Sequence, residues 1–214
     1  MRKHTVSQIM QVVIMLVAAS YSLHATAANR MPATSRPATP QLTQSYTWFD
    51  GDREQTVWLN PQAVAEFNPG KQGVSAARSA DANAKQIPMK RTQQGVRLWQ
   101  MNNTGDAAIH GLAKSNPAGK YSPVFHDGPS SSASMRALPG NIIVYLNPSW
   151  NATLVDAWVK KRKLEIVKKL DIGPNIYVLK TGPGLEALDT ANTLYKSGEV
   201  TAAFPDWWQG VEAK

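Results

Sequence analysis

The chain has 214 residues, a formal net charge of +8 and no cysteine. Without cysteine, the protein has no disulfide framework and no lipoprotein attachment site, and a metal site would need carboxylates beside histidine. The excess of Lys and Arg weakly favours acidic partners and anionic surfaces.

The first 27 residues have the pattern of a secretory signal peptide. Arg2 and Lys3 give a positive start, Ile9 to Ala19 form an apolar segment, and Ala25-Thr-Ala27 is a small-x-small cleavage site. The apolar segment is shorter than the about 20 residues that span a membrane. We therefore predict cleavage after Ala27, a periplasmic or secreted product, and no stable membrane span after cleavage. A non-cleaved anchor is the alternative.

A linker and a small β-rich unit are predicted next. Residues 28–45 carry prolines among Thr, Ser and Ala, a composition typical of a disordered linker. Tyr46–Phe49 and Gln55–Leu59 flank the turn residues Asp50-Gly-Asp52, which predicts a β-hairpin. The further strand candidates of this unit, which covers residues 46–127, are Ala63–Phe67 and Val96–Gln100.

Two segments of this region lack periodicity. Residues 70–94 are rich in Gly, Ala, Ser, Lys and Gln, which predicts a long flexible loop. Residues 128–138 begin with Gly-Pro and a serine run, which predicts a second linker. The unit 46–127 therefore has few core residues for an independent domain.

Residues 139–208 alternate strand and helix signals. Asn141–Asn147 is a β-branched run bounded by prolines, and Asn151 is suited to cap a following amphipathic helix that ends at Lys160–Lys163. The remaining elements are the strands Leu164–Leu170, Asn175–Thr181 and Glu199–Phe204 and a helix over Leu185–Tyr195, with Gly198 at its end. Two βαβ units joined in this way predict an α+β fold, with a ferredoxin-like βαββαβ antiparallel sheet and two helices on one face.

The face of this sheet opposite the helices is expected to be open. If Ile142 points toward the helices, the two-residue period of a strand places Ile143 and Tyr145 on the open side. Tyr177 and Leu179 are expected to join them. An apolar open face calls for a binding partner.

Several short motifs in this region resemble the propeptide, or inhibitor, domain of subtilisin-like serine proteases. They are Asn141–Pro148, Leu164–Lys169, Ile176–Leu179, Gly184–Leu188 and Val200–Asp206, together with Tyr121–Gly128 in the segment that leads into the domain. The last strand of that family ends in Val-x-x-Ala-x-Pro-Asn, and this chain has Asp206 in place of the Asn.

The resemblance implies a mechanism. Such propeptides lay the open sheet face on two helices of the protease, assist its folding and place their C-terminal tail in the substrate cleft. The chain has none of the Asp, His-Gly and Gly-Thr-Ser motifs of a catalytic domain, so we predict a free-standing, non-enzymatic protein without a cofactor or metal. Its predicted partner is a subtilisin-like serine protease. The docking residues are predicted to be Ile143, Tyr145, Tyr177 and Leu179, and the tail, residues 209–214, is predicted to place Val211, Glu212, Ala213 and Lys214 in the cleft.

Two rival functions remain open. The same face could bind a structural partner in the cell envelope, or the chain could be a propeptide remnant without a protease. An RNA-binding sheet with Tyr145 and Tyr177 stacking on bases conflicts with export, so no nucleic-acid partner is expected. The basic run Lys160–Lys163, followed by Lys168 and Lys169, is interpreted as a solvated helix end.

The residues that carry possible chemistry predict no active site. His126 and Asp127 are interpreted as a solvated turn and Ser130–Ser132 as linker, because no nucleophile motif surrounds them. Gly182-Pro-Gly184 is predicted to be a plain turn from strand to helix and not an anion-binding loop. Trp207-Trp208 could anchor the protein to a sugar or membrane, or could cover a sheet edge.

Overall fold

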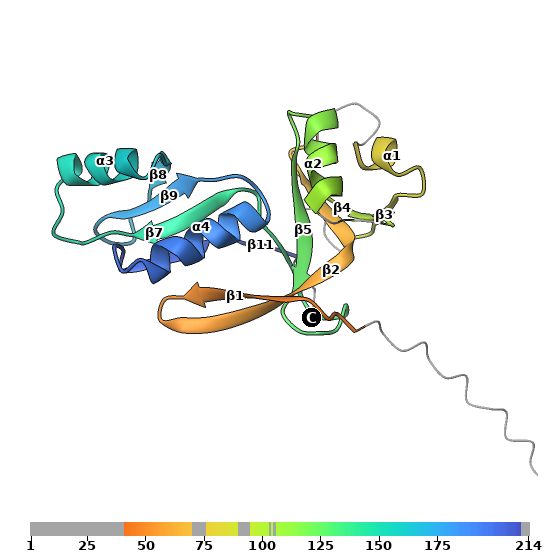
Figure 1. Cartoon of the computed structure of the whole chain (residues 1–214), viewed down its shortest axis with the longest axis horizontal. Coiled ribbons are helices and arrows are strands. Elements are labelled where there is room, and N and C mark those ends of the chain that lie inside the picture. The colour runs from red at the N-terminus through yellow and green to blue at the C-terminus, as the bar shows by residue number, and fades with distance from the viewer. Residues whose placement is uncertain (1–40, 70–75, 90–94, 103, 105, 211–214) are drawn as a thin grey trace, which may run out of the picture. The chain divides into compact units, whose positions relative to one another are not determined.

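Figure 1 shows a computed structural model of the protein, which describes residues 41–69, 76–89, 95–102, 104 and 106–210. All of these described residues belong to one compact unit. The described residues form an α+β structure with four helices and antiparallel sheets. The predicted signal peptide and the tail residues Val211–Lys214 lie outside the described residues.

The first sheet has seven strands in the order β11-β6-β5-β2-β4-β3, with β1 paired to β2. The predicted hairpin is confirmed: β1 and the first half of β2 pair from Ser45 opposite Trp58 to Asp50 opposite Arg53, around Gly51 with a φ of 65°. The elements of this part are β1 (Ser45–Asp50), β2 (Arg53–Phe67), α1 (Ala76–Ala80), β3 (Lys85–Ile87), β4 (Val96–Gln100), α2 (Asp106–Ser115), β5 (Lys120–His126), β6 (Met135–Ala137) and β11 (Trp208–Gln209).

β2 is a long strand whose two halves have different partners on one side. It pairs with β5 in both halves, with a register shift between Asn60 and Val64. On its other side, the first half pairs with β1 and the second half pairs with β4. The predicted strand Ala63–Phe67 is thus the end of β2 and not a separate element. The predicted strand Val96–Gln100 is confirmed as β4.

Three segments predicted to be irregular contain regular structure. Residues 70–94 include α1 and β3, residues 128–138 include β6, and the linker 28–45 ends in a bridge from Gln41 to Ser130 and in the start of β1. These elements have three to five residues in the first two segments, which is too few to show a period in the sequence. Their strands form because longer neighbours, β4 and β5, offer backbone partners.

The second sheet has four strands in the order β10-β7-β9-β8, and every pair is antiparallel. The predicted succession of strands and helices is confirmed, with β7 (Asn141–Tyr145), α3 (Ala152–Lys161), β8 (Glu165–Lys169), β9 (Ile176–Lys180), α4 (Leu185–Lys196) and β10 (Ala202–Pro205). Asn151 caps α3 by accepting a hydrogen bond from the Leu154 backbone N–H at 3.0 Å. Gly198, with a φ of 69°, follows α4 as predicted.

The largest apolar core receives residues from both sheets. It contains Val155, Trp158 and Val159 of α3, together with Ala187, Leu188, Ala191 and Leu194 of α4, packed on the second sheet. Trp48, Val57 and Phe125 of the first sheet belong to the same core. The β1–β2 hairpin also lies beside α4 (Figure 1), where the Asn192 side-chain N–H donates to the Thr47 carbonyl at 2.8 Å. The two sheets therefore share one interior.

Candidate functional site

The face of the second sheet opposite its helices follows from the strand register. Residues directly opposite each other in an antiparallel pair point to the same face. Ile143 lies opposite Val178 on one side and Phe204 on the other, and Tyr145 lies opposite Ile176. We name this face the second face, and its residues are Ile143, Tyr145, Lys168, Ile176, Val178, Ala202 and Phe204.

The prediction for Tyr177 and Leu179 is wrong. They lie opposite Val144 and Ile142, on the face that packs against the helices, and their exposed fractions are 8% and 0%. The side chains of β9 do alternate between the two faces of the sheet. Which residues share a face with Ile143 and Tyr145 depends on the register between β9 and β7, and the sequence does not show this register. Ile176 and Val178 lie on the second face in place of Tyr177 and Leu179, and Phe204, which the sequence analysis missed, lies there too.

The second face keeps an apolar surface that is partly exposed. Ile143, Tyr145 and Phe204 are half-buried, while Ile176 and Val178 are buried between them and their neighbours. The rings of Tyr145 and Phe204 lie 5.8 Å apart at an angle of 42°. The second face thus presents two aromatic side chains and Ile143 to solvent beside the buried Ile176 and Val178. Exposed Lys168 lies at its β8 edge.

The end of the chain returns to the first sheet. Trp208 and Gln209 form β11, opposite Ala137 and Arg136 of β6, and the Gly210 backbone N–H donates to the Met135 carbonyl at 2.9 Å. The predicted free tail, residues 209–214, therefore begins with two residues held by backbone hydrogen bonds. Val211–Lys214 lie outside the described residues.

Trp207 and Trp208 are half-buried and pack against other aromatic rings of the fold. Trp207 meets Trp48 and Phe125 edge to face, with ring centroids 5.6 Å apart in both pairs. Trp208 packs against Phe67, with centroids 6.4 Å apart. Of the two interpretations left open for Trp207-Trp208, the packing favours the one in which they cover a sheet edge.

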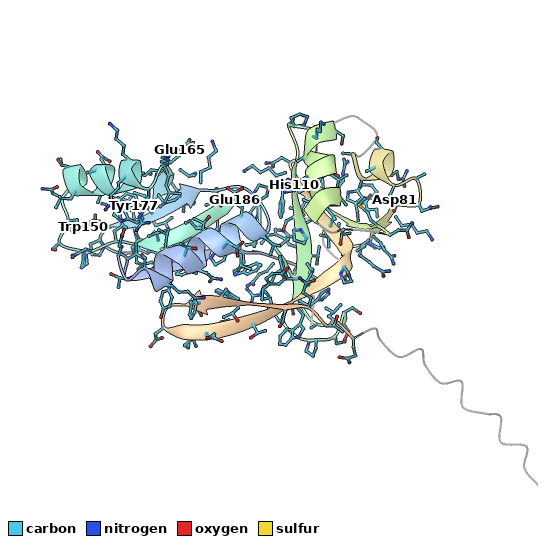
Figure 2. All side chains as sticks on the ribbon, viewed as in Figure 1. Asp81, His110, Trp150, Glu165, Tyr177 and Glu186 are labelled. Carbon is cyan, nitrogen blue, oxygen red and sulfur yellow. The ribbon has the colours of Figure 1, made fainter. Side chains whose placement is uncertain are left out.

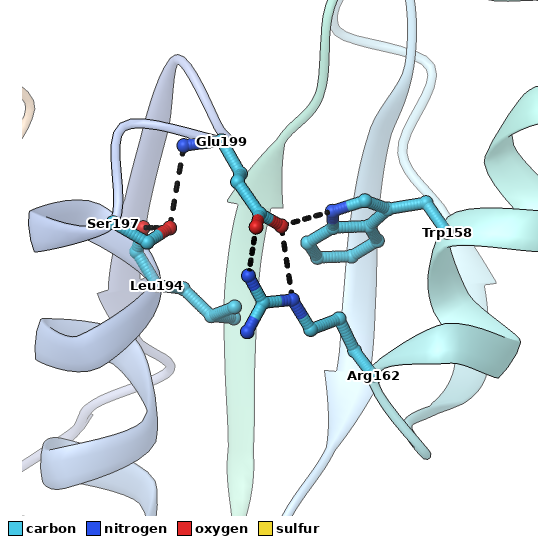
Figure 3. A network of polar contacts seen from close by, with 5 residues as sticks. All are labelled: Trp158, Arg162, Leu194, Ser197 and Glu199. Carbon is cyan, nitrogen blue, oxygen red and sulfur yellow. Dashed lines mark hydrogen bonds and ion pairs between the residues drawn. The ribbon is translucent and has the colours of Figure 1, made fainter.

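A polar network joins the two helices of the second sheet (Figure 3). The Glu199 carboxylate accepts hydrogen bonds from Arg162 Nε at 2.9 Å and Trp158 Nε1 at 3.1 Å, and it forms an ion pair with the Arg162 guanidinium. The hydrogen bond from Arg162, and then the one from Trp158, hold the pKa of Glu199 below its ordinary value. Ser197 accepts from the Glu199 backbone N–H at 3.2 Å. The network ties the end of α3 to the turn after α4.

A second polar cluster is buried in the first sheet. Glu66 is 2% exposed and accepts hydrogen bonds from Trp99 Nε1 at 2.8 Å and the Tyr121 hydroxyl at 3.4 Å. Burial raises the pKa of Tyr121, and the nearby Glu66 carboxylate raises it further, whereas the hydrogen bond from Asn116 opposes the shift. These groups satisfy one another inside the fold and present no group to solvent for catalysis.

The two histidines outside the predicted signal peptide occupy different environments. His126 is 1% exposed: its Nδ1 donates to the Ala133 carbonyl at 2.8 Å, and its Nε2 lies 3.2 Å from the Asn60 side-chain nitrogen. The prediction of a solvated turn is wrong for His126, because β5 extends to this residue and pairs with β2 and β6. His110 is exposed on α2 (Figure 2).

The remaining sequence candidates are occupied by internal contacts. The backbone N–H groups of Gly182 and Gly184 donate to the Glu186 side chain at 2.8 Å and to the Leu138 carbonyl at 3.0 Å. The segment thus has the predicted turn before α4, with these two donors already used. Ser130 and Ser132 share a hydroxyl hydrogen bond of 2.8 Å at the bridge to Gln41.

A groove of about 500 Å³ lies between α2, β5 and the start of α4. Its floor includes Tyr121, Pro123 and Leu185, and exposed His110 and Glu186 stand on facing elements (Figure 2). One oxygen of Glu186 already accepts the Gly182 N–H. The other polar residues that line the groove are Asp189 and Thr190 of α4.

Within the described ranges, no cluster of three or more His, Asp or Glu side chains is arranged to hold a metal ion. None of the helices in the described part of the chain is long and apolar enough to cross a membrane. No model of a protein family matches the sequence, and comparisons with curated proteins and with solved structures find no match.

Proposed function

We propose that this chain is an exported, propeptide-like protein that binds a subtilisin-like serine protease as an inhibitor, a folding assistant or both. The observation that carries the proposal is the second face: an antiparallel sheet keeps Ile143, Tyr145 and Phe204 half-exposed while both helices cover the opposite face. The strand order β10-β7-β9-β8, with a helix in each crossover, supports a ferredoxin-like arrangement for residues 139–208. The motif resemblance points to the same domain.

Docking would use the second face without Tyr177 and Leu179, because these two side chains are already buried against the helices. Tyr145 and Phe204 are suited to this role, since aromatic side chains contribute large contact areas with little loss of rotamer freedom. Lys168 lies at the rim of the same face and is available for an acidic group of the partner.

The contacts that hold Trp207 to Gly210 determine which residues can enter a substrate cleft. Because β11 and Trp207 fix the chain up to Gly210, the segment that enters a cleft is reduced to Val211–Lys214. Fixing the start of this segment lowers the entropy lost when it becomes ordered in the cleft. Deletion of residues 211–214 is therefore expected to abolish inhibition while leaving the fold intact.

The test is an inhibition assay with a purified subtilisin-like protease and the chain from residue 28. We expect Ile143→Ser combined with Tyr145→Ser to weaken inhibition at least about tenfold, because two apolar contacts are lost. Ile172→Ser is the control, since Ile172 is exposed but lies outside the second face. An unfolding curve must show that the double variant remains folded. Equal inhibition by the wild type, the double variant and the tail deletion would contradict the proposal.

The pairing of β11 with β6 also favours a second candidate function. It holds residues up to Gly210 on the first sheet, where they are not available to a substrate cleft, and this favours a module that binds a protein through its sheet face. Such an envelope module or propeptide remnant would bind no serine protease. A pull-down from secreted material, probed with an active-site serine label, separates the two functions: a labelled protease supports the first, and envelope proteins alone support the second.

A further inference from the structure

The exposed large hydrophobic side chains of the described residues gather in one part of the chain. They are Leu154 on α3, Val167 on β8 and Ile172 in the turn after β8, with exposed fractions of 50%, 50% and 71%. All three fall within one run of 19 positions, 154–172, whereas the other large hydrophobic residues of the described chain are at least partly buried. This concentration needs an explanation, because single exposed hydrophobic residues are usually scattered.

The same run carries a concentration of positive charge. Its exposed lysines are Lys160, Lys161, Lys163, Lys168 and Lys169. Nearby acidic groups are partly neutralised, since Glu199 pairs with Arg162 and Glu165 pairs with Lys180. Lys169 also lies over the Tyr177 ring, 5.9 Å from its centroid.

The balance of charge in this run is positive. None of these five lysines makes an ion pair with a described residue. The acidic residues of the run that also make no ion pair are the exposed Asp156 and Asp171. The unpaired lysines therefore outnumber the unpaired carboxylates by five to two.

The elements of this run lie along one side of the second sheet. β8 is an edge strand that pairs only with β9, and α3 contacts β8 (Figure 1). At one end, the Leu164 backbone N–H donates to the Val159 carbonyl at 3.1 Å. At the other end, the Asn175 side-chain N–H donates to the Trp150 carbonyl at 2.8 Å, which ties the turn after β8 to the start of α3. We name α3, residues 162–164, β8 and the turn 170–174 the basic margin.

We infer that the basic margin attaches the protein to the surface of an anionic lipid membrane. Lysines near an anionic lipid surface each strengthen binding by about fivefold, and exposed aliphatic side chains enter the boundary between headgroups and acyl chains. Lysines alone would fit any polyanion, including a free phosphate polymer. The exposed Val167 and Ile172 beside them favour a lipid surface over a phosphate polymer, because the polymer offers no apolar material to these side chains.

Lys168 of β8 belongs to both the second face and the basic margin, but the residues changed in the test below, Lys161, Lys163 and Ile172, lie outside the second face. Peripheral attachment requires no membrane-spanning helix. Protease inhibition in solution and vesicle binding can therefore succeed or fail separately.

The experiment measures binding to vesicles with the chain from residue 28, which omits the apolar predicted signal peptide and keeps the compact unit 38–214. Vesicles of phosphatidylglycerol mixed equally with phosphatidylcholine are compared with phosphatidylcholine alone. We expect binding to the anionic vesicles, little binding to the neutral ones, and release at high salt. Lys161→Gln with Lys163→Gln should weaken the binding by about 20- to 30-fold.

The matched control is Lys85→Gln with Lys114→Gln, which removes the same charge from exposed lysines of β3 and α2. Only a small loss, about twofold, is expected from the control, because charges beyond a Debye length of the membrane are screened. Ile172→Ser should also weaken binding to the anionic vesicles. Inorganic polyphosphate is tested as a soluble competitor and ligand.

Three results would overturn the inference. The first is no binding to anionic vesicles at low salt, and the second is an equal loss for the two lysine double variants, which would show that only the total charge matters. The third is tight binding of polyphosphate with no effect of Ile172→Ser on vesicle binding, which would identify the partner as a soluble phosphate polymer. A specific loss with the Lys161 and Lys163 double variant and with Ile172→Ser supports the inference.

Discussion

The guanidinium of Arg136 lies over the indole of Trp207, 5.9 Å from the ring centroid, and over Trp48 at 5.7 Å. Arg136 also forms an ion pair with Asp127 through its Nε atom. Since Trp48 belongs to β1, Arg136 to β6 and Trp207 to the segment between β10 and β11, this contact joins three distant parts of the chain. Together with the pairing of β11 with β6, it holds the chain end beside the β1–β2 hairpin.

Trp207→Ala is expected to lower the free energy of unfolding by about 2–3 kcal/mol, because a half-buried ring and its edge-to-face contacts are lost. Trp207→Phe keeps one ring at the site and should cost less. Urea unfolding measures both. The control Arg53→Gln removes an exposed ion pair with Asp50 and should change stability by less than about 1 kcal/mol. If Trp207→Ala lowers the free energy of unfolding no more than Arg53→Gln does, the contacts of Trp207 with Trp48, Phe125 and Arg136 do not stabilise the fold.

His126→Ala is expected to destabilise the fold by about 3 kcal/mol, because it removes the partner of the half-buried Ala133 carbonyl and of the Asn60 side-chain nitrogen and opens a cavity at a buried site. His110→Ala, which changes an exposed histidine on α2, should stay within about 0.5 kcal/mol of the wild type. Thermal or urea unfolding of the two variants gives the comparison. Equal stability of the two variants would show that the contacts of His126 contribute nothing measurable.

Glu199→Gln is expected to weaken the fold at neutral pH and to have less effect in acid. A carboxyl whose pKa is depressed in the folded state contributes stability above its unfolded pKa and loses it as the pH falls through the folded value. Because the pKa of Glu199 lies below the ordinary 4.5, the difference between wild type and Glu199→Gln should shrink below that pH. Urea midpoints measured from neutral pH to acid test this.

The control for this experiment is Glu165→Gln, which removes an exposed ion pair with Lys180. An exposed pair contributes about 0–1 kcal/mol, so little change is expected at neutral pH. A difference between wild type and Glu199→Gln that persists unchanged in acid would contradict a role for the charged carboxylate in the contact with Arg162 and Trp158.

Gly184→Ala is expected to destabilise the protein more than Gly198→Ala. Both glycines have positive φ, 72° and 69°, but Gly184 also has a ψ of −137°, a combination that side-chain-bearing residues rarely adopt. A Cβ at Gly184 would also lie 3.0 Å from Pro123 Cδ, whereas a Cβ at Gly198 would meet nothing within 4 Å. The larger cost at Gly184 therefore reflects both its backbone conformation and the close approach of β5 to the start of α4. Equal costs in urea unfolding would contradict this prediction.

The local structure of the chain was largely readable from its residues. The hairpin around Gly51, the cap at Asn151 and the end of α4 near Gly198 depend on neighbours within a few positions, and all three are present. The missed elements α1, β3 and β6 are too short to produce a period. The sequence analysis also missed the longer α2 and β5, whose length does not explain the miss. In the candidate site, Ile143 and Tyr145 lie on the second face, as their alternation with Ile142 indicates.

The alignment of distant segments depends on the packed fold and could not be predicted from the sequence. Alternation assigns Tyr177 and Leu179 to one face of β9 but does not say which face of the sheet that is, and pairing with Ile142 and Val144 places them in the core. In the same way, no local signal shows that Trp208 pairs with Ala137. Propensities, caps and periods act within one segment, whereas strand register and shared burial are set by the free energy of the whole packed chain.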